Sequence, residues 1–228
     1  MGGVASETPA KARLAMTWRL VFAAIGCLAI AYQWWAAVYG QMSTSPLGST
    51  IVYFSFFTTQ TNVLANLIFL TPVLAPNSRI GRWAASEGVR AAVAMYICVV
   101  GLVFHFILSA TWKPEGLAAL GNLVVHYIMP AAVVLDWLLF TPKGRLRWVD
   151  PVKWLAFPLV YGLWTVIHGA MIGWYPYFFI DIGKLGWAKT LINYAGLLVF
   201  FLLVGCVLVA LDRTLGVRHR RDDPPSST

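Results

Sequence analysis

Polar residues that could do chemistry recur inside stretches of the chain that are otherwise apolar. One such stretch carries five consecutive polar residues, Thr58-Thr59-Gln60-Thr61-Asn62. A threonine hydroxyl becomes nucleophilic only beside a base, and a neutral histidine is the usual base. A later apolar stretch supplies His126. Together the two stretches indicate acyl transfer or ester hydrolysis, with Thr59 as the nucleophile and His126 as the base.

Helical spacing adds supporting polar groups to both candidates. Residues three and four apart share a helix face, so Asn62 lies one turn from Thr59 and Asn122 lies one turn from His126. Asn62 could donate to an oxyanion, and Asn122 could help to position the His126 ring. Thr58 lies at the edge of the same face. The alternative for these residues is a role in hydrogen bonding between helices.

Two further histidines and an aromatic segment belong to the same set of candidates. His105 and His168 each lie in an apolar stretch of their own. Polar groups inside a bilayer are costly, so each histidine is either a hydrogen-bonded packing residue or part of a site. The segment that contains Trp174 and Tyr175 is dense in aromatic residues. It could form an aromatic belt at the membrane surface, or it could fold back as a lid over the site.

The composition of the chain requires a bilayer as the solvent. The 228 residues are 59% hydrophobic and 11% charged, and their mean hydropathy is +0.71. An ordinary soluble domain is roughly 45–50% apolar and about 25% charged. A chain of this length cannot bury so much apolar surface in one aqueous core. A soluble enzyme is therefore excluded, and so is a nucleic-acid partner, which needs a folded basic surface.

The apolar pattern predicts an all-α, polytopic membrane protein with six transmembrane helices in one bundle. Each predicted span has the length of about 20 residues that a membrane-crossing helix needs: 17–39, 50–71, 88–111, 117–141, 152–173 and 188–211. The domain organisation is then a cytoplasmic N-terminal tail (1–16), the six-helix domain (17–212) and a disordered cytoplasmic C-terminal tail (213–228).

The distribution of Lys and Arg sets the predicted orientation. Most of these residues fall on one side of the spans: Lys11, Arg13, Arg19, Arg79, Arg82, Arg90, Lys143, Arg145, Arg147, Lys153, Arg213, Arg218, Arg220 and Arg221. Only three fall on the other side: Lys113, Lys184 and Lys189. Because positive loops stay in the cytoplasm, we expect a multi-pass protein of the cell membrane with both termini cytoplasmic. Asp136, near the inner end of its span, is expected to form an interfacial ion pair.

The spans also give each polar residue a depth. With a rise of 1.5 Å per residue, Thr59 and His126 both lie roughly 14 Å below the outer surface. By the same rise His105 and His168 lie roughly 8–9 Å deep. The sequence therefore predicts one polar cavity in the outer half of the bilayer, built from the second to fifth spans.

Cofactor chemistry has weaker support in the sequence. Each histidine is alone on its helix, whereas di-haem bundles place two on a helix. A zinc site with three histidines has no spacing motif to support it. We therefore predict no cofactor and no metal.

Several strings together resemble a bacterial family of six-helix membrane proteins, the Pr-six-Pr family. They are FFTTQTN from Phe56, NxxxHYxxP from Asn122, LDW from Leu135, PLVY from Pro158 and GWYPY from Gly173. The resemblance covers all six predicted spans and implies the six-helix fold.

That family in turn distantly resembles the androgen-induced FAR/AIG-type intramembrane threonine hydrolases. This second resemblance implies hydrolysis of fatty acid esters of hydroxy fatty acids, with a membrane lipid or lipid-like ester as substrate. It matches the nucleophile to Thr59, with Thr58 as the one-residue alternative, and the base to His126. It also matches His168 and the Trp174-Tyr175-Pro176 string. The alternative function is a non-catalytic membrane protein that binds or transports a lipid or small molecule.

Overall fold

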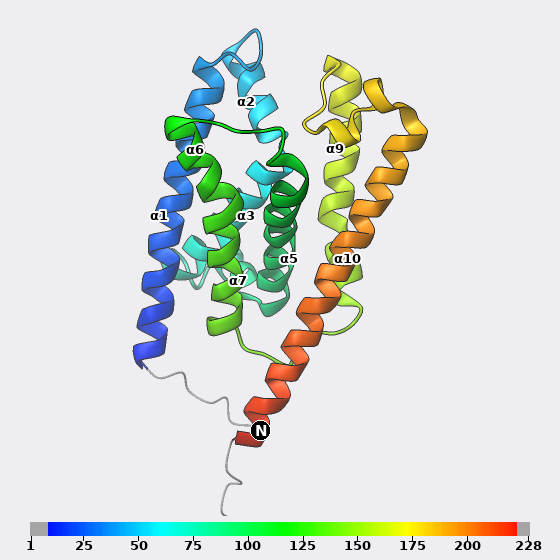
Figure 1. The fold of residues 1–228 in the computed structure, drawn as a ribbon. Coiled ribbons are helices and arrows are strands. Elements are labelled where there is room, and N and C mark those ends of the chain that lie inside the picture. The colour runs from blue at the N-terminus through cyan, green and yellow to red at the C-terminus, as the bar shows by residue number, and fades with distance from the viewer. Residues whose placement is uncertain (1–8, 223–228) are drawn as a thin grey trace, which may run out of the picture.

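The fold is a bundle of long apolar helices (Figure 1). The computed structural model describes the backbone of residues 9–222 and the side chains of residues 9–217, and within that range all regular structure is helical. In this part of the chain, five helical segments are long and apolar enough to cross a membrane, or up to six if one bent pair counts as a span. The chain is therefore a polytopic integral membrane protein, and the predicted all-α class is confirmed.

The elements follow one another along the chain as α1 (Pro9–Tyr39), α2 (Pro46–Phe54), α3 (Phe57–Leu74), α4 (Arg79–Ala85), α5 (Glu87–Val103), η1 (Phe104–Leu108), α6 (Gly116–Leu123), η2 (Val124–Ile128), α7 (Met129–Phe140), α8 (Asp150–Trp154), α9 (Ala156–Ile172), η3 (Phe178–Ile180) and α10 (Ile182–Asp222). Five of the predicted spans correspond to α1, to α5 with η1, to the run from α6 to α7, to α8 with α9, and to α10.

The second predicted span is not the continuous helix that the sequence suggests. It breaks between α2 and α3, where Phe56 is extended (φ −78°, ψ 133°). A second break follows Leu74, and α4 leaves the axis of α3 at an angle of 116°. Pro72 lies in the last turn of α3 and removes one backbone donor there. The first break matters most, because it lies beside the candidate nucleophiles.

Two short π-helical segments interrupt the bundle, and each carries one histidine. In η1, which holds His105, the N–H of Ser109 donates to Phe104 O over 2.8 Å. In η2, which holds His126, the N–H of Met129 donates to the carbonyl of Val124. Pro130 follows directly and has no N–H to donate to the carbonyl of His126. Such π-bulges are rare and occur often at functional sites.

The core of the bundle surrounds α5, which is the most buried of the five candidate spans. Helices α3 and α7 pack on one side of α5, with α1 packed against α3 and α7, and the hairpin of α9 and α10 lies on the other side (Figure 1). The ring of Phe57 joins the two groups. It packs with ring-centroid distances of 5.0–6.5 Å against Tyr96, Phe157, Tyr161 and Phe201.

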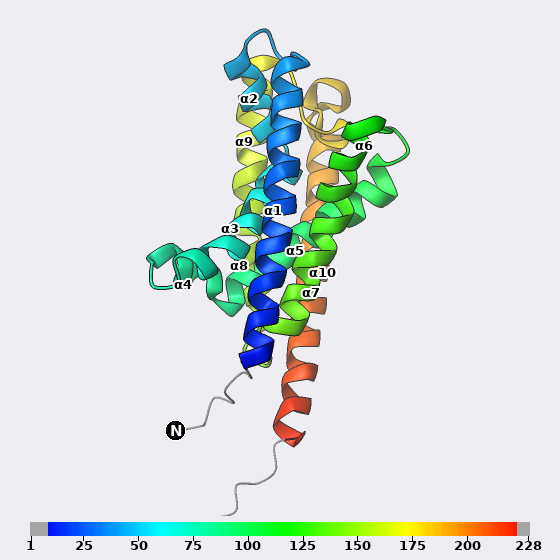
Figure 2. The ribbon, with the colours of Figure 1, turned by 90° about the vertical axis from the view of Figure 1, so that its left-hand side faces the viewer.

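The described chain starts and stops at the same end of the bundle (Figure 1 and Figure 2), and positive charge gathers there. This end carries the starts of α1 and α5, the 141–149 loop, α8 and the last turns of α10. We call it the basic end because it holds these cations: Lys11, Arg13, Arg19, Arg90, Lys143, Arg145, Arg147, Lys153 and Arg213. We call the other the opposite end.

Helix extends into both segments that the sequence assigns to tails. The first helix already begins at Pro9, and α10 continues to Asp222, so residues 213–222 are helical rather than disordered. The carboxylate of Asp212 anchors the end of α10, since it accepts from the N–H groups of Gly144 and Leu146 over 2.9 Å each. Residues 1–8 and 223–228 of the predicted tails lie outside the described part of the chain.

Candidate active site

The break before α3 places Thr58 in the first turn of a helix. Backbone N–H groups in a first turn have no acceptor within their own helix. The N-cap residue Phe56 offers no side-chain acceptor. The N–H of Thr58 instead donates to the hydroxyl of Tyr177 over 3.3 Å. The Thr58 hydroxyl therefore lies beside a backbone donor that the helix itself does not use.

His126 reaches the hydroxyl of Thr58. The distance from Thr58 Oγ1 to His126 Nε2 is 3.4 Å. The other ring nitrogen, Nδ1, lies 3.1 Å from the backbone carbonyl of Asn122. A carbonyl only accepts, so Nδ1 carries the proton and Nε2 is left as a free acceptor. Phe104 stacks on the imidazole with a centroid distance of 3.9 Å and holds the ring in this orientation.

This arrangement selects Thr58 rather than the predicted Thr59 as the partner of His126. Thr59 is 6% exposed, and the hydrogen bond of His126 Nε2 is to Thr58 rather than to Thr59. The prediction counted helical turns along one continuous span. Because the helix restarts at Phe57, the face that meets η2 passes through Thr58. The sequence analysis named Thr58 as the one-residue alternative, and the structure brings that residue to the base.

Asn62 supports the site through the backbone. Its side-chain Nδ2 donates to Thr58 O over 2.9 Å and to Val125 O over 3.2 Å. The side chain is fully buried and joins α3 to η2 directly behind the Thr58–His126 contact. Asn122 also acts through its backbone, by its carbonyl. The structure therefore gives both asparagines a positioning geometry, and the Asn62 amide already donates to two backbone carbonyls rather than to an oxyanion position.

Tyr177 is a site residue that the sequence analysis missed. It lies between α9 and α10, two residues after Tyr175 in the predicted aromatic segment. Its hydroxyl is 3.4 Å from Thr58 Oγ1, in addition to its contact with the Thr58 N–H. Burial raises the pKa of this phenol above its ordinary value, so it stays protonated and can donate a hydrogen bond. The density of aromatic residues in this segment was the one signal in the sequence that pointed to a site residue, but it did not distinguish Tyr177 from its aromatic neighbours.

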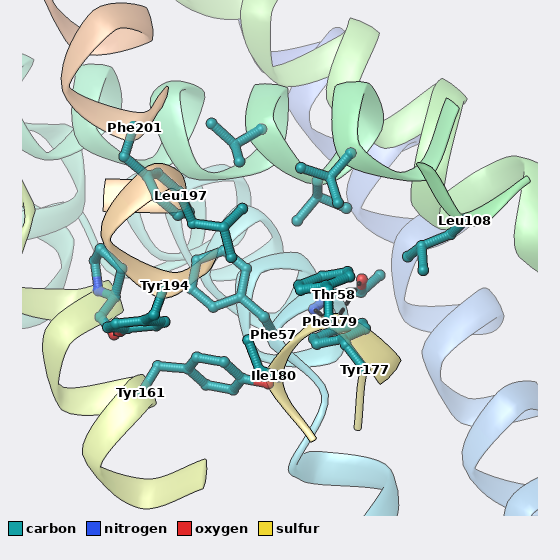
Figure 3. A pocket seen from close by; sticks show the side chains of 14 residues that line it. Phe57, Thr58, Leu108, Tyr161, Tyr177, Phe179, Ile180, Tyr194, Leu197 and Phe201 are labelled. Carbon is teal, nitrogen blue, oxygen red and sulfur yellow. Dashed lines mark hydrogen bonds between the residues drawn. The ribbon is translucent and has the colours of Figure 1, made fainter. Parts of the chain in front are cut away.

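A small cavity opens in front of Thr58 (Figure 3). Its volume is about 50 Å³, and residues of α3, α5, η1, α9, α10 and the segment before α10 line it. The lining is mostly aliphatic and aromatic, with the hydroxyls of Thr58 and three tyrosines as its polar groups: Tyr161, Tyr177 and Tyr194. The prediction of a polar cavity built from the second to fifth spans is therefore wrong in two respects. This cavity is mostly apolar, and α10 of the sixth span lines it whereas the fourth span and the histidines do not.

His168 belongs to a second polar group beside the same helix break. Its Nδ1 lies 3.3 Å from Ser55 Oγ, and its ring stacks on Trp164 with a centroid distance of 5.1 Å. The indole N–H of Trp164 donates to the same serine oxygen over 3.2 Å. Trp174 meets His168 edge to face at 6.3 Å. The structure thus brings the predicted residues His168 and Trp174 together. They form a group separate from the Thr58–His126 contact.

The last two predicted residues lie farther from the candidate nucleophile. His105 is exposed, and its Nδ1 is 3.2 Å from the hydroxyl of Tyr127 rather than near Thr58. Tyr175 packs onto Gly169 of α9 so closely that an added Cβ there would lie 2.1 Å from its ring. Tyr175 thereby fixes the segment that carries Tyr177 onto the bundle.

Among the described residues, no three His, Cys, Asp or Glu side chains come together in the way that metal ligands do. The ionic contacts of Asp136 and Asp181 lie elsewhere: Asp136 pairs with arginines at the basic end, and Asp181 pairs with Lys184. What this geometry defines is a polytopic membrane protein with a Thr–His pair inside its bundle. Comparison with protein-family models finds no match, and neither do comparisons with curated proteins and with solved structures.

Proposed function

We propose that this protein is an intramembrane ester hydrolase in which Thr58 is the nucleophile and His126 the base. The observation that carries the proposal is the 3.4 Å contact between Thr58 Oγ1 and His126 Nε2. The contact is useful because the Asn122 carbonyl holds the ring proton on Nδ1. A nucleophile and a base within hydrogen-bond reach, with the base oriented by a third group, is the recurring arrangement in covalent catalysis, and the distance is often looser before substrate binds.

The chemistry follows from these positions. The Thr58 hydroxyl attacks the ester carbonyl while its proton passes to His126 Nε2. The oxyanion of the tetrahedral intermediate accepts hydrogen bonds from the Thr58 N–H and from the Tyr177 hydroxyl. The alcohol leaves with the proton from His126, and Thr58 is left acylated. Water then attacks the acyl group, its proton passes to His126, and the acid departs as Thr58 recovers its proton.

Tyr177 also limits access to the site. Its hydroxyl occupies the position on the Thr58 N–H that the oxyanion needs. The substrate carbonyl must therefore displace this oxygen, which requires a small movement of the segment between α9 and α10. After that movement the Tyr177 hydroxyl lies next to the oxyanion and can donate a hydrogen bond to it. The segment is thus proposed to act as a lid, as the aromatic run of the sequence suggests.

The depth of the site favours an ester inside a hydrocarbon chain. His126 lies about ten residues, or roughly 15 Å, along the helix from the start of α6. The hydrocarbon core of a bilayer is roughly 30 Å thick, so this position is close to its middle. Ester groups of glycerolipids lie near the bilayer surface, whereas the ester of a fatty acid with a hydroxy fatty acid lies partway along a chain. We therefore propose that second class of lipid as the substrate, with entry from the bilayer.

The orientation is part of the proposal. The cations at the basic end favour the cytoplasmic side of the cell membrane for that end. Both termini would then be cytoplasmic, and the lid would cover the site from the outer side of the membrane.

A second candidate is a protein that binds a lipid or small molecule without turnover. One observation favours it: the third group behind His126 is a neutral carbonyl rather than a carboxylate. A carboxylate would stabilise the imidazolium that forms during catalysis, as in the Ser–His–Asp triad. Retention of a ligand in the apolar cavity without release of acid and alcohol would favour this candidate.

Turnover of a defined ester tests the proposal. Purified protein in detergent micelles is given a fatty acid ester of a hydroxy fatty acid, and free acid is measured over time. We expect T58A and H126Q each to lower kcat roughly 10²–10⁴-fold, the usual contribution of a nucleophile–base unit. The matched controls T59A and H105Q should keep most of the activity. Full activity of T58A, or an equal loss in T58A and T59A, would contradict the assignment.

A further inference from the structure

A cluster of three charged side chains joins α1, α5 and α7 at the basic end. Asp136 Oδ1 accepts from Arg19 Nε over 2.8 Å, and Asp136 Oδ2 accepts from Arg90 Nη1. The side chains of Asp136 and Arg90 are 2% and 3% exposed. Arg90 is further satisfied by Ile68, whose carbonyl accepts from Nη2 over 3.0 Å. That carbonyl is free because the residue four positions later is Pro72, which has no N–H.

The cluster carries one more positive charge than negative charge. Both oxygens of Asp136 are used, and both Nη atoms of Arg90 have acceptors. Arg19 uses only Nε, and among the described residues no acceptor faces its two Nη groups. A buried or half-buried charge without a counter-ion is costly. The unused pair of Nη groups is also the fork that binds a phosphate with two parallel hydrogen bonds.

The cluster lies at the level of the lipid phosphates. Arg90 and Asp136 are each about one turn, or roughly 5 Å, from the basic ends of their helices. Arg19 lies roughly 30 Å along α1 from Tyr39 at the opposite end, which is the thickness of a hydrocarbon core. The outward face of α1 beside Arg19 is apolar and exposed at Met16, Leu20 and Val21. The acyl chains of a lipid can pack on that apolar surface, whereas a phosphate ion free in water makes no favourable contact with it.

We infer that the Arg19 guanidinium binds the phosphate of an anionic phospholipid in the leaflet at the basic end. The lipid supplies the second negative charge, so that two arginines face one carboxylate and one phosphate. The remaining contacts are acyl chains along the exposed face of α1. This site is separate from the Thr58–His126 pair, and it does not depend on any catalytic activity.

Native mass spectrometry of the full-length protein in detergent measures the binding. Phosphatidylglycerol is titrated in, with phosphatidylcholine of the same chains as the zwitterionic comparison and inorganic phosphate as the water-borne comparison. Loss of a bidentate, charge-assisted contact is expected to weaken phosphatidylglycerol binding roughly tenfold in R19Q. R13Q, which removes an exposed arginine from the same helix, should bind like the unmodified protein.

R19Q leaves Asp136 and Arg90 as a one-to-one pair, so the fold should persist. R19K provides a second variant: it keeps the charge but loses the fork, and it should bind more weakly than the unmodified protein. Equal phosphatidylglycerol binding by R19Q, R19K and the unmodified protein would overturn the inference. So would equal retention of phosphatidylcholine, or saturation of the site by inorganic phosphate alone.

Discussion

Replacing Asp136 by Asn is the perturbation of the fold with the largest expected effect. The carboxylate holds Arg19 and Arg90 from two other helices. Asn keeps the size of the side chain but removes its charge, and two arginines are then left without a counter-ion. Breaking a buried ion pair by removing one partner costs about 3–5 kcal/mol. We expect D136N to lower the free energy of unfolding by an amount in that range.

Unfolding in mixed detergent micelles, followed by the fluorescence of the 11 tryptophans, measures this change. E87Q is the matched control, because Glu87 pairs with Arg145, whose side chain is 61% exposed. An exposed pair contributes only about 0–1 kcal/mol. Salt should weaken the effect of E87Q and leave that of D136N largely unchanged. A loss in D136N no larger than in E87Q would refute the claim that the buried carboxylate is the counter-ion of both arginines.

Three other outcomes are expected. In G169A the new Cβ would lie 2.1 Å from the ring of Tyr175, so hydrogen exchange of the lid peptide should accelerate; G196A, with open space around its Cβ, should not change it. Burial lowers the pKa of Lys143 from 10.5 to about 8. Between these values the unfolded chain binds more protons, so unfolding free energy should rise from pH 8 to 10.5, and K143M should remove that rise. In H105Q the ester-hydrolysis pH profile should match that of the unmodified protein, since His105 faces Tyr127; a shifted profile would place His105 in the mechanism. Unchanged hydrogen exchange of the lid peptide in G169A would contradict the packing of Tyr175 on Gly169. A pH dependence of stability in K143M equal to that of the unmodified protein would contradict the burial of Lys143.

The membrane-spanning helices could be predicted because their cause is local. The length of each apolar run and the cost of unpaired backbone groups in lipid are properties of the sequence alone. The existence of an ion pair at Asp136 could also be predicted, because a carboxylate near the end of a membrane span is costly unless it pairs with a cation. Its partners, Arg19 and Arg90, were not predictable, because they depend on which helices become neighbours.

The break between α2 and α3 escaped prediction for a similar reason. Neither Gly nor Pro marks Ser55 or Phe56. Tertiary contacts satisfy the freed groups instead: the carbonyl of Ser55 accepts from the hydroxyl of Tyr161, and its side chain accepts from Trp164. The choice of Thr59 rested on its spacing from Asn62 and on a depth counted along one continuous span. Thr58 is also one turn from Asn62, and which of the two threonines meets His126 depends on how α3 packs against η2.

The position of a covalent adduct tests the central claim most directly. A fluorophosphonate reacts with an activated hydroxyl, and peptide mass spectrometry identifies the modified residue. The account predicts one adduct, on Thr58, that disappears in H126Q and persists in T59A. An adduct on Thr59, or labelling of Thr58 that is unchanged in H126Q, would contradict the assignment of Thr58 and His126 as nucleophile and base.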